Sequence, residues 1–182
     1  MSHKTNLFNI FSILGMSNSI ASEIKNQLKK SNDLKEDNTS VLDDNPKSHI
    51  AYQLYNRGMI KFGVFILKSG QKSSVYFDLR QLTSEPQFLK QAIQKGYSYS
   101  GGSHNDKFDL VCGVPTAGIS LATVFSLEFD LPNIWVRKES KNYGLKRQIE
   151  GKFKPGQRVL LLDDVITSGT SLRETITILE NS

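Results

Sequence analysis

Residues 159–171 read VLLLDDVITSGTS, so that four apolar residues lead directly into two aspartates and a loop of small polar residues. The apolar run at 159–162 is typical of a strand that is covered on both faces. In open α/β sheets, ligands bind beyond the carboxyl ends of such strands. The stretch therefore predicts a buried strand that delivers Asp163 and Asp164 to a binding site.

The loop after the two aspartates has the chemistry of an anion site. Its hydroxyls and backbone N–H groups lie at the start of a predicted helix, and Gly169 permits a backbone conformation that other residues resist. The aspartates repel phosphate, but they suit sugar hydroxyls and, through these or through water, a Mg²⁺ ion. The chain has no GxxxxGK[ST] motif, which excludes a P-loop. An ordinary strand, turn and capped helix is the alternative, although tandem aspartates followed by TSGT favour a binding loop.

Composition narrows the class of protein. The 182 residues suffice for one domain with a real core. We expect no membrane span, because no stretch approaches the roughly 20 apolar residues that one needs. The net charge of +5 favours anionic partners, and both nucleic acid and a polyphosphate substrate fit it. Cys112 is the single cysteine, so an internal disulfide is excluded, and we expect a compartment that is reducing or at least does not demand disulfides.

The chain divides into two parts by composition. Residues 1–47 are rich in Asn, Ser and Lys and predict a weakly ordered extension, with a short apolar run at 7–14 and an amphipathic helix possible at 19–30. A transit peptide is unsupported because the segment contains no arginine. Residues 48–182 have the composition of a globular domain.

Within that domain, predicted strands alternate with predicted helices. Strands are expected at 60–67, 75–79, 108–111, 134–136 and 159–162, and helices at 50–56, 86–95, 118–127 and 171–179. This alternation predicts an α/β fold with a central parallel sheet flanked by helices. A βαβ unit needs a strand after its helix, and the chain stops at Ser182, so we expect the C-terminal strands to be missing.

Three further segments carry candidate binding groups. Residues 65–80 (FILKSGQKSSVYFDLR) present a lysine beside a tight turn and two adjacent aromatics, and a plain hairpin with a surface lysine explains them equally well. Residues 112–118 (CGVPTAG) join a strand to a helix, where backbone N–H groups meet anions, or form a simple turn.

Residues 137–154 (RKESKNYGLKRQIEGKFK) form a basic loop that could close over a pyrophosphate. A solvated charged loop is the commoner fate of such runs, and nucleic-acid binding is disfavoured because few aromatics interleave with the lysines.

The order of these motifs, FxLKSGxxSxxYFDLR, GVPTAG, RKESKxYG and LLLDDVITSGTS, resembles that of the orotate phosphoribosyltransferases, which have the type I phosphoribosyltransferase fold. The resemblance covers residues 50–179. It implies that Tyr76, Phe77 and Thr167 line the orotate pocket and that Lys141, Asp163 and Asp164 are catalytic. Tyr143 stands where many relatives have histidine, so no proton-donor role is expected there. The residues implied to bind phosphoribosyl pyrophosphate are Lys68, Thr116, Ala117, Arg137, Lys138, Lys141, Tyr143, Asp163, Asp164, Val165, Ile166, Thr167, Ser168, Gly169, Thr170 and Ser171.

The resemblance also implies a reaction and its setting. Orotate and phosphoribosyl pyrophosphate would give orotidine 5′-monophosphate and pyrophosphate in UMP biosynthesis, with Mg²⁺ held mainly through the substrate and not by direct protein ligands. A cytoplasmic homodimer that shares the basic loop across its interface is expected, without nucleic-acid or membrane partners. Relatives continue past the last helix and carry there an arginine for the orotate carboxylate. An inactive fragment or a non-catalytic regulatory protein that binds phosphoribosyl pyrophosphate is therefore the alternative, against which the basic loop argues.

Overall fold

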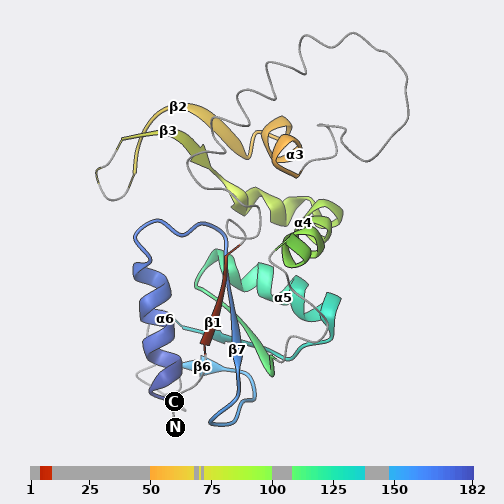
Figure 1. The fold of residues 1–182 in the computed structure, drawn as a ribbon, viewed down its shortest axis with the longest axis vertical. Helices are drawn as coiled ribbons and strands as arrows, with labels where there is room; N and C mark the ends of the chain where they lie inside the picture. Colours follow the sequence, from red (N-terminus) through yellow and green to blue (C-terminus); the bar gives the residue numbers. More distant parts are fainter. Residues whose placement is uncertain (1–4, 10–49, 68–69, 71, 100–107, 138–147) are drawn as a thin grey trace.

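The computed structural model describes residues 5–9, 50–67, 70, 72–99, 108–137 and 148–182. Along the chain the elements are β1 (Thr5–Asn9), α3 (Ile50–Asn56), β2 (Ile60–Ile66), β3 (Lys72–Phe77), the 3₁₀ helix η2 (Leu79–Ser84), α4 (Pro86–Tyr99), β4 (Leu110–Gly113), α5 (Ala117–Phe129), β5 (Asn133–Val136), β6 (Ile149–Glu150), β7 (Val159–Asp163) and α6 (Thr170–Glu180). Figure 1 shows the sheet between α6 on one side and α5 with α4 on the other. The predicted α/β fold is confirmed.

The central sheet has five strands in the order β1-β7-β4-β5-β6. The pairs β1–β7, β7–β4 and β4–β5 are parallel, as predicted, whereas β6 runs antiparallel to β5. The sheet is therefore mixed. The strand β6 is only two residues long, and no apolar run in the sequence predicted it. It pairs because the chain returns along β5, which places Ile149 opposite Val136.

Both faces of the two middle strands are covered, and alternation explains which residues face which way. Val111, Leu160 and Leu162 belong to the core beneath α4 and α5. Leu161 and Cys112 instead pack with residues of α6. All five residues of β7 are buried, which is the outcome that its continuous apolar run predicted.

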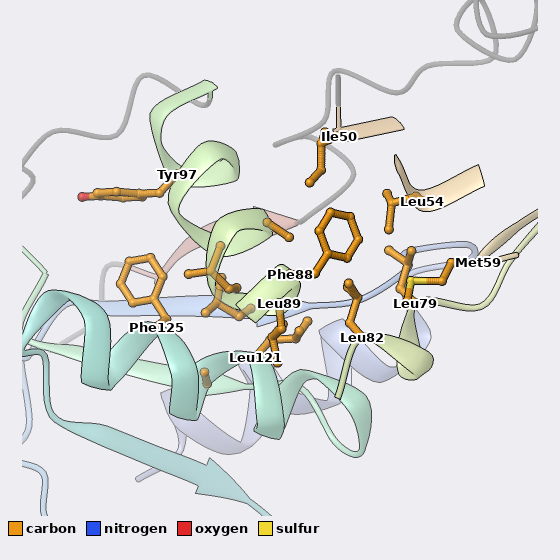
Figure 2. Close-up of a cluster of buried hydrophobic side chains, with 14 of the residues drawn as sticks. Ile50, Leu54, Met59, Leu79, Leu82, Phe88, Leu89, Tyr97, Leu121 and Phe125 are labelled. Carbon is orange, nitrogen blue, oxygen red and sulfur yellow. The ribbon is translucent and has the colours of Figure 1, made fainter. Parts of the chain in front are cut away.

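The larger core joins the sheet to α3, α4 and the hairpin (Figure 2). Ile93 of α4 and Leu121 of α5 are almost fully buried in it. Tyr97 packs edge-on against Phe125, with ring centroids 5.1 Å apart, an arrangement favoured by the ring quadrupoles. This core fixes α5 against the sheet, and the turn that leads into α5 contributes Pro115 to the cavity described below.

The strands β2 and β3 form a separate antiparallel hairpin. The predicted strand at 75–79 ends earlier, at Phe77, and Leu79 instead begins η2. The reason is a set of tertiary contacts, since the backbone N–H of Asp78 donates to the carbonyl of Met59 at 2.8 Å and the chain then turns to bury Leu79 in the core. The hairpin thus ends at Phe77, and the chain turns at Asp78 into η2.

The segment predicted as a weakly ordered extension contributes one strand. The strand β1 pairs with β7 along its whole length, from Thr5 opposite Val159 to Asn9 opposite Asp163. It covers the edge of β7 that would otherwise present unpaired backbone groups. The rest of the predicted extension, residues 1–4 and 10–47, lies outside the described residues. None of the described helices combines the length and apolarity that crossing a membrane demands.

Candidate functional site

The candidate site lies at the carboxyl ends of β7 and β4, beside an open cavity of about 1010 Å³. Parallel strands bring their carboxyl ends to the same edge, so the loops after them meet there. The cavity is lined by Pro115, Val136, Arg137, Gln148, Asp163, Val165, Ile166, Thr167, Ser168, Gly169, Thr170, Ser171, Leu172, Arg173, Glu174, Thr175, Thr177 and Ile178. The predicted loop residues from Val165 to Ser171 therefore share one cavity with Arg137.

The two aspartates differ in environment. Asp163 is the last residue of β7 and is 8% exposed, whereas Asp164 is half-buried. The backbone N–H of Asp164 donates to Oδ1 of Asp163 at 2.9 Å. Burial, and next the neighbouring charge of Asp164, raise the pKa of Asp163 to about 7. Near neutral pH, Asp163 therefore exchanges its proton readily, and a cation or a hydroxyl donor in the cavity would favour its ionised form.

The loop after the aspartates is shaped by its small residues. Gly169 has a φ of 71°, which is the left-handed region, and it precedes the first turn of α6. The hydroxyls of Ser168 and Thr170 lie 2.9 Å apart, and Arg173 donates to the carbonyl of Ser168 at 3.0 Å. Among the described residues, none accepts a hydrogen bond from the backbone N–H groups of Thr167 or Ser168. A helix N-terminus with available donors is suited to an anion such as phosphate.

A second turn, between β4 and α5, lies against the same strand. The backbone N–H of Val114 donates to the carbonyl of Leu162 at 2.8 Å, and the Pro115–Thr116 peptide bond is cis. A Cβ on Gly118 would lie only 2.3 Å from the carbonyl oxygen of Leu162. Glycine at this position therefore permits the helix to approach the strand, and it places Thr116 and Ala117 at the start of α5, close to the edge that carries Asp163.

Arg137 follows β5 and also lines the cavity. Its backbone N–H donates to the carbonyl of Gln148 at 2.8 Å, and its Nε donates to Oε1 of Glu150 at 2.5 Å. The guanidinium is held by a carboxylate of β6, so its position is defined before any ligand binds. Glu150 engages Nε and Nη2, so Arg137 would meet an anion through the remaining donors of its guanidinium.

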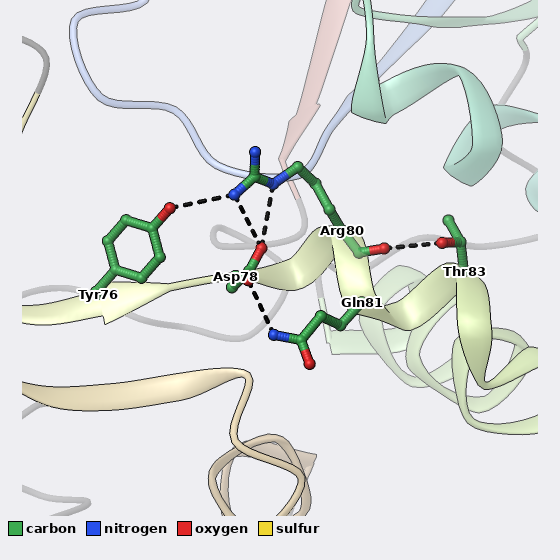
Figure 3. Close-up of polar contacts among 5 residues, drawn as sticks. All are labelled: Tyr76, Asp78, Arg80, Gln81 and Thr83. Carbon is green, nitrogen blue, oxygen red and sulfur yellow. Dashed lines mark hydrogen bonds and ion pairs between the residues drawn. The ribbon is translucent and has the colours of Figure 1, made fainter.

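The predicted aromatic pair on the hairpin divides between two faces, as strand alternation requires. Phe77 packs against the larger core. Tyr76 lies on the other face, where its ring is 5.4 Å from that of Phe65 and its hydroxyl accepts a hydrogen bond from Arg80 (Figure 3). Of the two aromatics, Tyr76 presents the ring that is not part of the core.

Four predicted residues, Lys68, Lys138, Lys141 and Tyr143, lie outside the described part of the chain. Conversely, Gln148 and Arg173 line the cavity although sequence reasoning did not select them, and Glu150 holds Arg137. Gln148 and Glu150 belong to a segment with no periodicity that predicts a strand. Arg173 could have been predicted from the sequence, since the side chain of a basic residue one turn into a helix can reach back to the loop that precedes the helix.

Comparisons with known proteins agree on one family. A family model described as a phosphoribosyl transferase domain matches residues 78–182. The chain is 45% identical over 128 residues to an orotate phosphoribosyltransferase of Caenorhabditis elegans, and the match spans 70% of this chain and 56% of the relative. It is 38% identical over 136 residues to an orotate phosphoribosyltransferase of Pyrococcus furiosus, which covers 75% of this chain and 74% of the relative. The crystal structure of orotate phosphoribosyltransferase from Aeropyrum pernix superposes with a TM-score of 0.60 at 34% identity, covering 72% of this chain and 73% of that one.

Proposed function

Because this chain belongs to the phosphoribosyl transferase family, and within it to the orotate phosphoribosyltransferases, we propose that it transfers the phosphoribosyl group of phosphoribosyl pyrophosphate to orotate. The observation that carries the proposal is the end of β7, where Asp163, which is hydrogen-bonded to the backbone of Asp164, and a loop with available N–H donors line one open cavity. A sugar phosphate needs both kinds of group at once, because its hydroxyls seek acceptors and its phosphate seeks donors.

The proposed chemistry assigns each part of the site a role. The loop from Val165 to Ser171 binds the 5′-phosphate, and Asp163 with Asp164 binds the ribose hydroxyls. A ring nitrogen of orotate bonds to the anomeric carbon as the bond to pyrophosphate breaks, and the proton of that N–H group passes to the departing pyrophosphate or to water. Positive charge develops on the ribose, where the aspartates stabilise it, while Arg137 meets the negative charge on the leaving group. Orotate is already anionic, so positioning and electrostatics carry most of the rate enhancement.

The residues at the site also fit a Mg²⁺ ion. Asp163 and Asp164 offer the hard oxygen ligands that Mg²⁺ prefers, and their adjacent negative charges leave the site in need of a cation. We assign the coordination mainly to the substrate, with these two side chains acting through water or through the hydroxyls of the substrate. When bound, Mg²⁺ supplies positive charge to the leaving pyrophosphate.

Assembly as a homodimer is part of the proposal. Val64 and Ile66 on the hairpin are 83% and 76% exposed, which supports an apolar contact with a second copy. An isolated two-stranded hairpin is marginally stable in water, so such a contact would also stabilise it. In this arrangement the basic loop that contains Lys141 closes over the neighbouring site. A cytoplasmic location is proposed as well, because the lone cysteine needs no oxidising compartment.

The test is an assay of orotidine 5′-monophosphate formation by the wild-type chain, the Lys141→Ala variant and, as a control, the Lys90→Ala variant, which changes an exposed lysine of α4. We expect turnover in the wild type and the control, and a loss of at least about 100-fold in Lys141→Ala with an unchanged Tm, since a lost charge contact in the transition state costs several kcal/mol. Equal turnover in Lys141→Ala would remove the loop from the mechanism. Binding of phosphoribosyl pyrophosphate without any turnover would instead favour the non-catalytic binding protein.

A further inference from the structure

The hairpin ends in a polar cluster for which the proposed mechanism has no role. Tyr76, Asp78, Arg80 and Gln81 lie together at the corner between β3 and η2, and hydrogen bonds connect them in series (Figure 3). The sequence motif YFDLR contains three of the four. Because Tyr76 is the predicted aromatic of the base pocket, the contacts that hold its ring bear on substrate binding.

Asp78 is the anchor of this cluster. Its backbone N–H donates to Met59 at 2.8 Å, which ties it to β2. Gln81 donates to its Oδ2 at 2.9 Å, and Arg80 Nε donates to its Oδ1 at 3.1 Å. The hydrogen bond from Gln81, and with it the bond and charge of Arg80, lower the pKa of Asp78 against the effect of burial. The carboxylate is therefore ionised at neutral pH, and both of its oxygens are engaged.

Arg80 is fixed by Asp78 although its side chain is 62% exposed. Its Nη2 lies 3.0 Å from Oδ1 of Asp78 and donates to the Tyr76 hydroxyl at 3.1 Å. Hydrogen bonds from a charged donor are stronger and more directional than neutral ones. The guanidinium of Arg80, which Asp78 holds in place, thus fixes the hydroxyl end of the Tyr76 ring.

The ring of Tyr76 is consequently held at two places. Its hydroxyl is bound by Arg80, and Phe65 contacts the ring at a centroid distance of 5.4 Å with the planes tilted by 32°. The pKa of Arg80 is raised first by Asp78 and, among weaker causes, by the charge of Asp164.

We propose that Arg80 is a positioning residue, which orients the Tyr76 ring for the incoming base through its hydrogen bond to the tyrosine hydroxyl. This inference rests on the proposed function, since it assumes that the base lies against Tyr76. It assigns Arg80 to the base side of the reaction and not to the phosphates. Asp78 neutralises the charge of Arg80, and the Nε and Nη2 donors of this guanidinium are bound to Asp78 and to the Tyr76 hydroxyl.

The test is a double-mutant cycle in the full chain with Tyr76→Phe, Arg80→Met and the double variant. The control is Arg158→Met, because Arg158 is a half-buried arginine paired with Asp109 at the opposite end of β7. We expect each single variant to raise the KM for orotate about 5- to 20-fold, the range for an exposed hydrogen bond to a charged group. The KM for phosphoribosyl pyrophosphate should stay within about twofold, and the double variant should be no worse than the worse single variant.

A second measurement is independent of turnover. With ring-labelled tyrosine, the NMR signal that Tyr76→Phe removes identifies Tyr76. This signal should shift in Arg80→Met, recover in part in Arg80→Lys, and stay in place in Arg158→Met. In the wild type it should also respond to added orotate, and Arg80→Met should weaken that response.

The outcomes separate the two proposals. Three results would each overturn the positioning role while leaving the proposed function intact. In the first, the effects of the two single variants on the KM for orotate multiply in the double variant. In the others, only the KM for phosphoribosyl pyrophosphate rises, or the Tyr76 signal does not shift in Arg80→Met. A wild type that makes no product, yet whose Tyr76 signal responds to orotate only when Arg80 is present, would refute the activity and support the positioning role. No response to orotate in the wild type would overturn the positioning role.

Discussion

Replacement of Gly118 by alanine should damage both the stability and the site, because this glycine sets the distance between α5 and β7. A Cβ at residue 118 would lie 2.3 Å from the carbonyl oxygen of Leu162, whereas real Cβ contacts are essentially never below 3.0 Å. The obstacle is backbone, so no side chain can rotate away. Either the start of α5 or the end of β7 must therefore move by about 0.7 Å.

The energetic cost follows from this movement. Overpacking costs about 1–3 kcal/mol, and disturbing the hydrogen bond from Val114 to Leu162 adds about 0.5–1.5 kcal/mol. The better helix propensity of alanine returns at most about 1 kcal/mol. We expect a net loss of about 2–3 kcal/mol in the free energy of unfolding, which lowers the Tm by about 5–10 °C in a protein of this size.

Thermal unfolding followed by circular dichroism measures the effect, with Gly63→Ala as the matched control. A Cβ at residue 63 would meet only the ring of Phe65, at 3.2 Å, and that exposed strand can adjust by a few tenths of an ångström. The Gly118→Ala variant should also bind phosphoribosyl pyrophosphate more weakly, because the end of β7 carries Asp163. If both variants unfold at the wild-type temperature, the close approach of helix and strand is refuted.

Three further perturbations test other parts of the molecule. Since the pKa of Asp163 is raised from 3.8 to about 7 in the folded state, the free energy of unfolding should fall as the pH rises through this interval. Asp163→Asn should flatten that dependence in urea titrations, and an unchanged slope would contradict the assignment. Replacing Asn6 and Leu7 together by proline should destabilise the protein and promote aggregation visible in light scattering, because at least one of two successive N–H groups faces β7. The same pair replaced by alanine should stay soluble, and equal behaviour of the two variants would argue against the β1–β7 pairing. Burial raises the pKa of Cys112 to about 12 and shields its thiol, so a maleimide should label it slowly in the native protein and rapidly in denaturant; rapid native labelling would show that the core opens.

The sequence alone was sufficient for the parts of this protein that depend on neighbouring residues. The buried strand β7, the loop with Gly169 and the helix after it were all predicted, because an apolar run, two aspartates and small polar residues act within one short segment. The alternation of strands and helices also determined the α/β class. Local patterns succeed where the physical cause, such as hydrophobic periodicity or backbone freedom, lies in consecutive residues.

Tertiary structure decided the features that join distant residues. The pairing of Thr5 with Val159 depends on an open sheet edge, and the composition of the first 47 residues carried no sign of it. The contact of Gly118 with Leu162 and the raised pKa of Asp163 likewise exist only once the helix and strands are packed. Arg80 stood in a quoted motif, yet its bond to Tyr76 required the turn at η2, since a fully extended strand would carry its side chain away from the tyrosine ring. Burial and long-range hydrogen bonds are set by where the chain returns in space, and no local pattern encodes that distance.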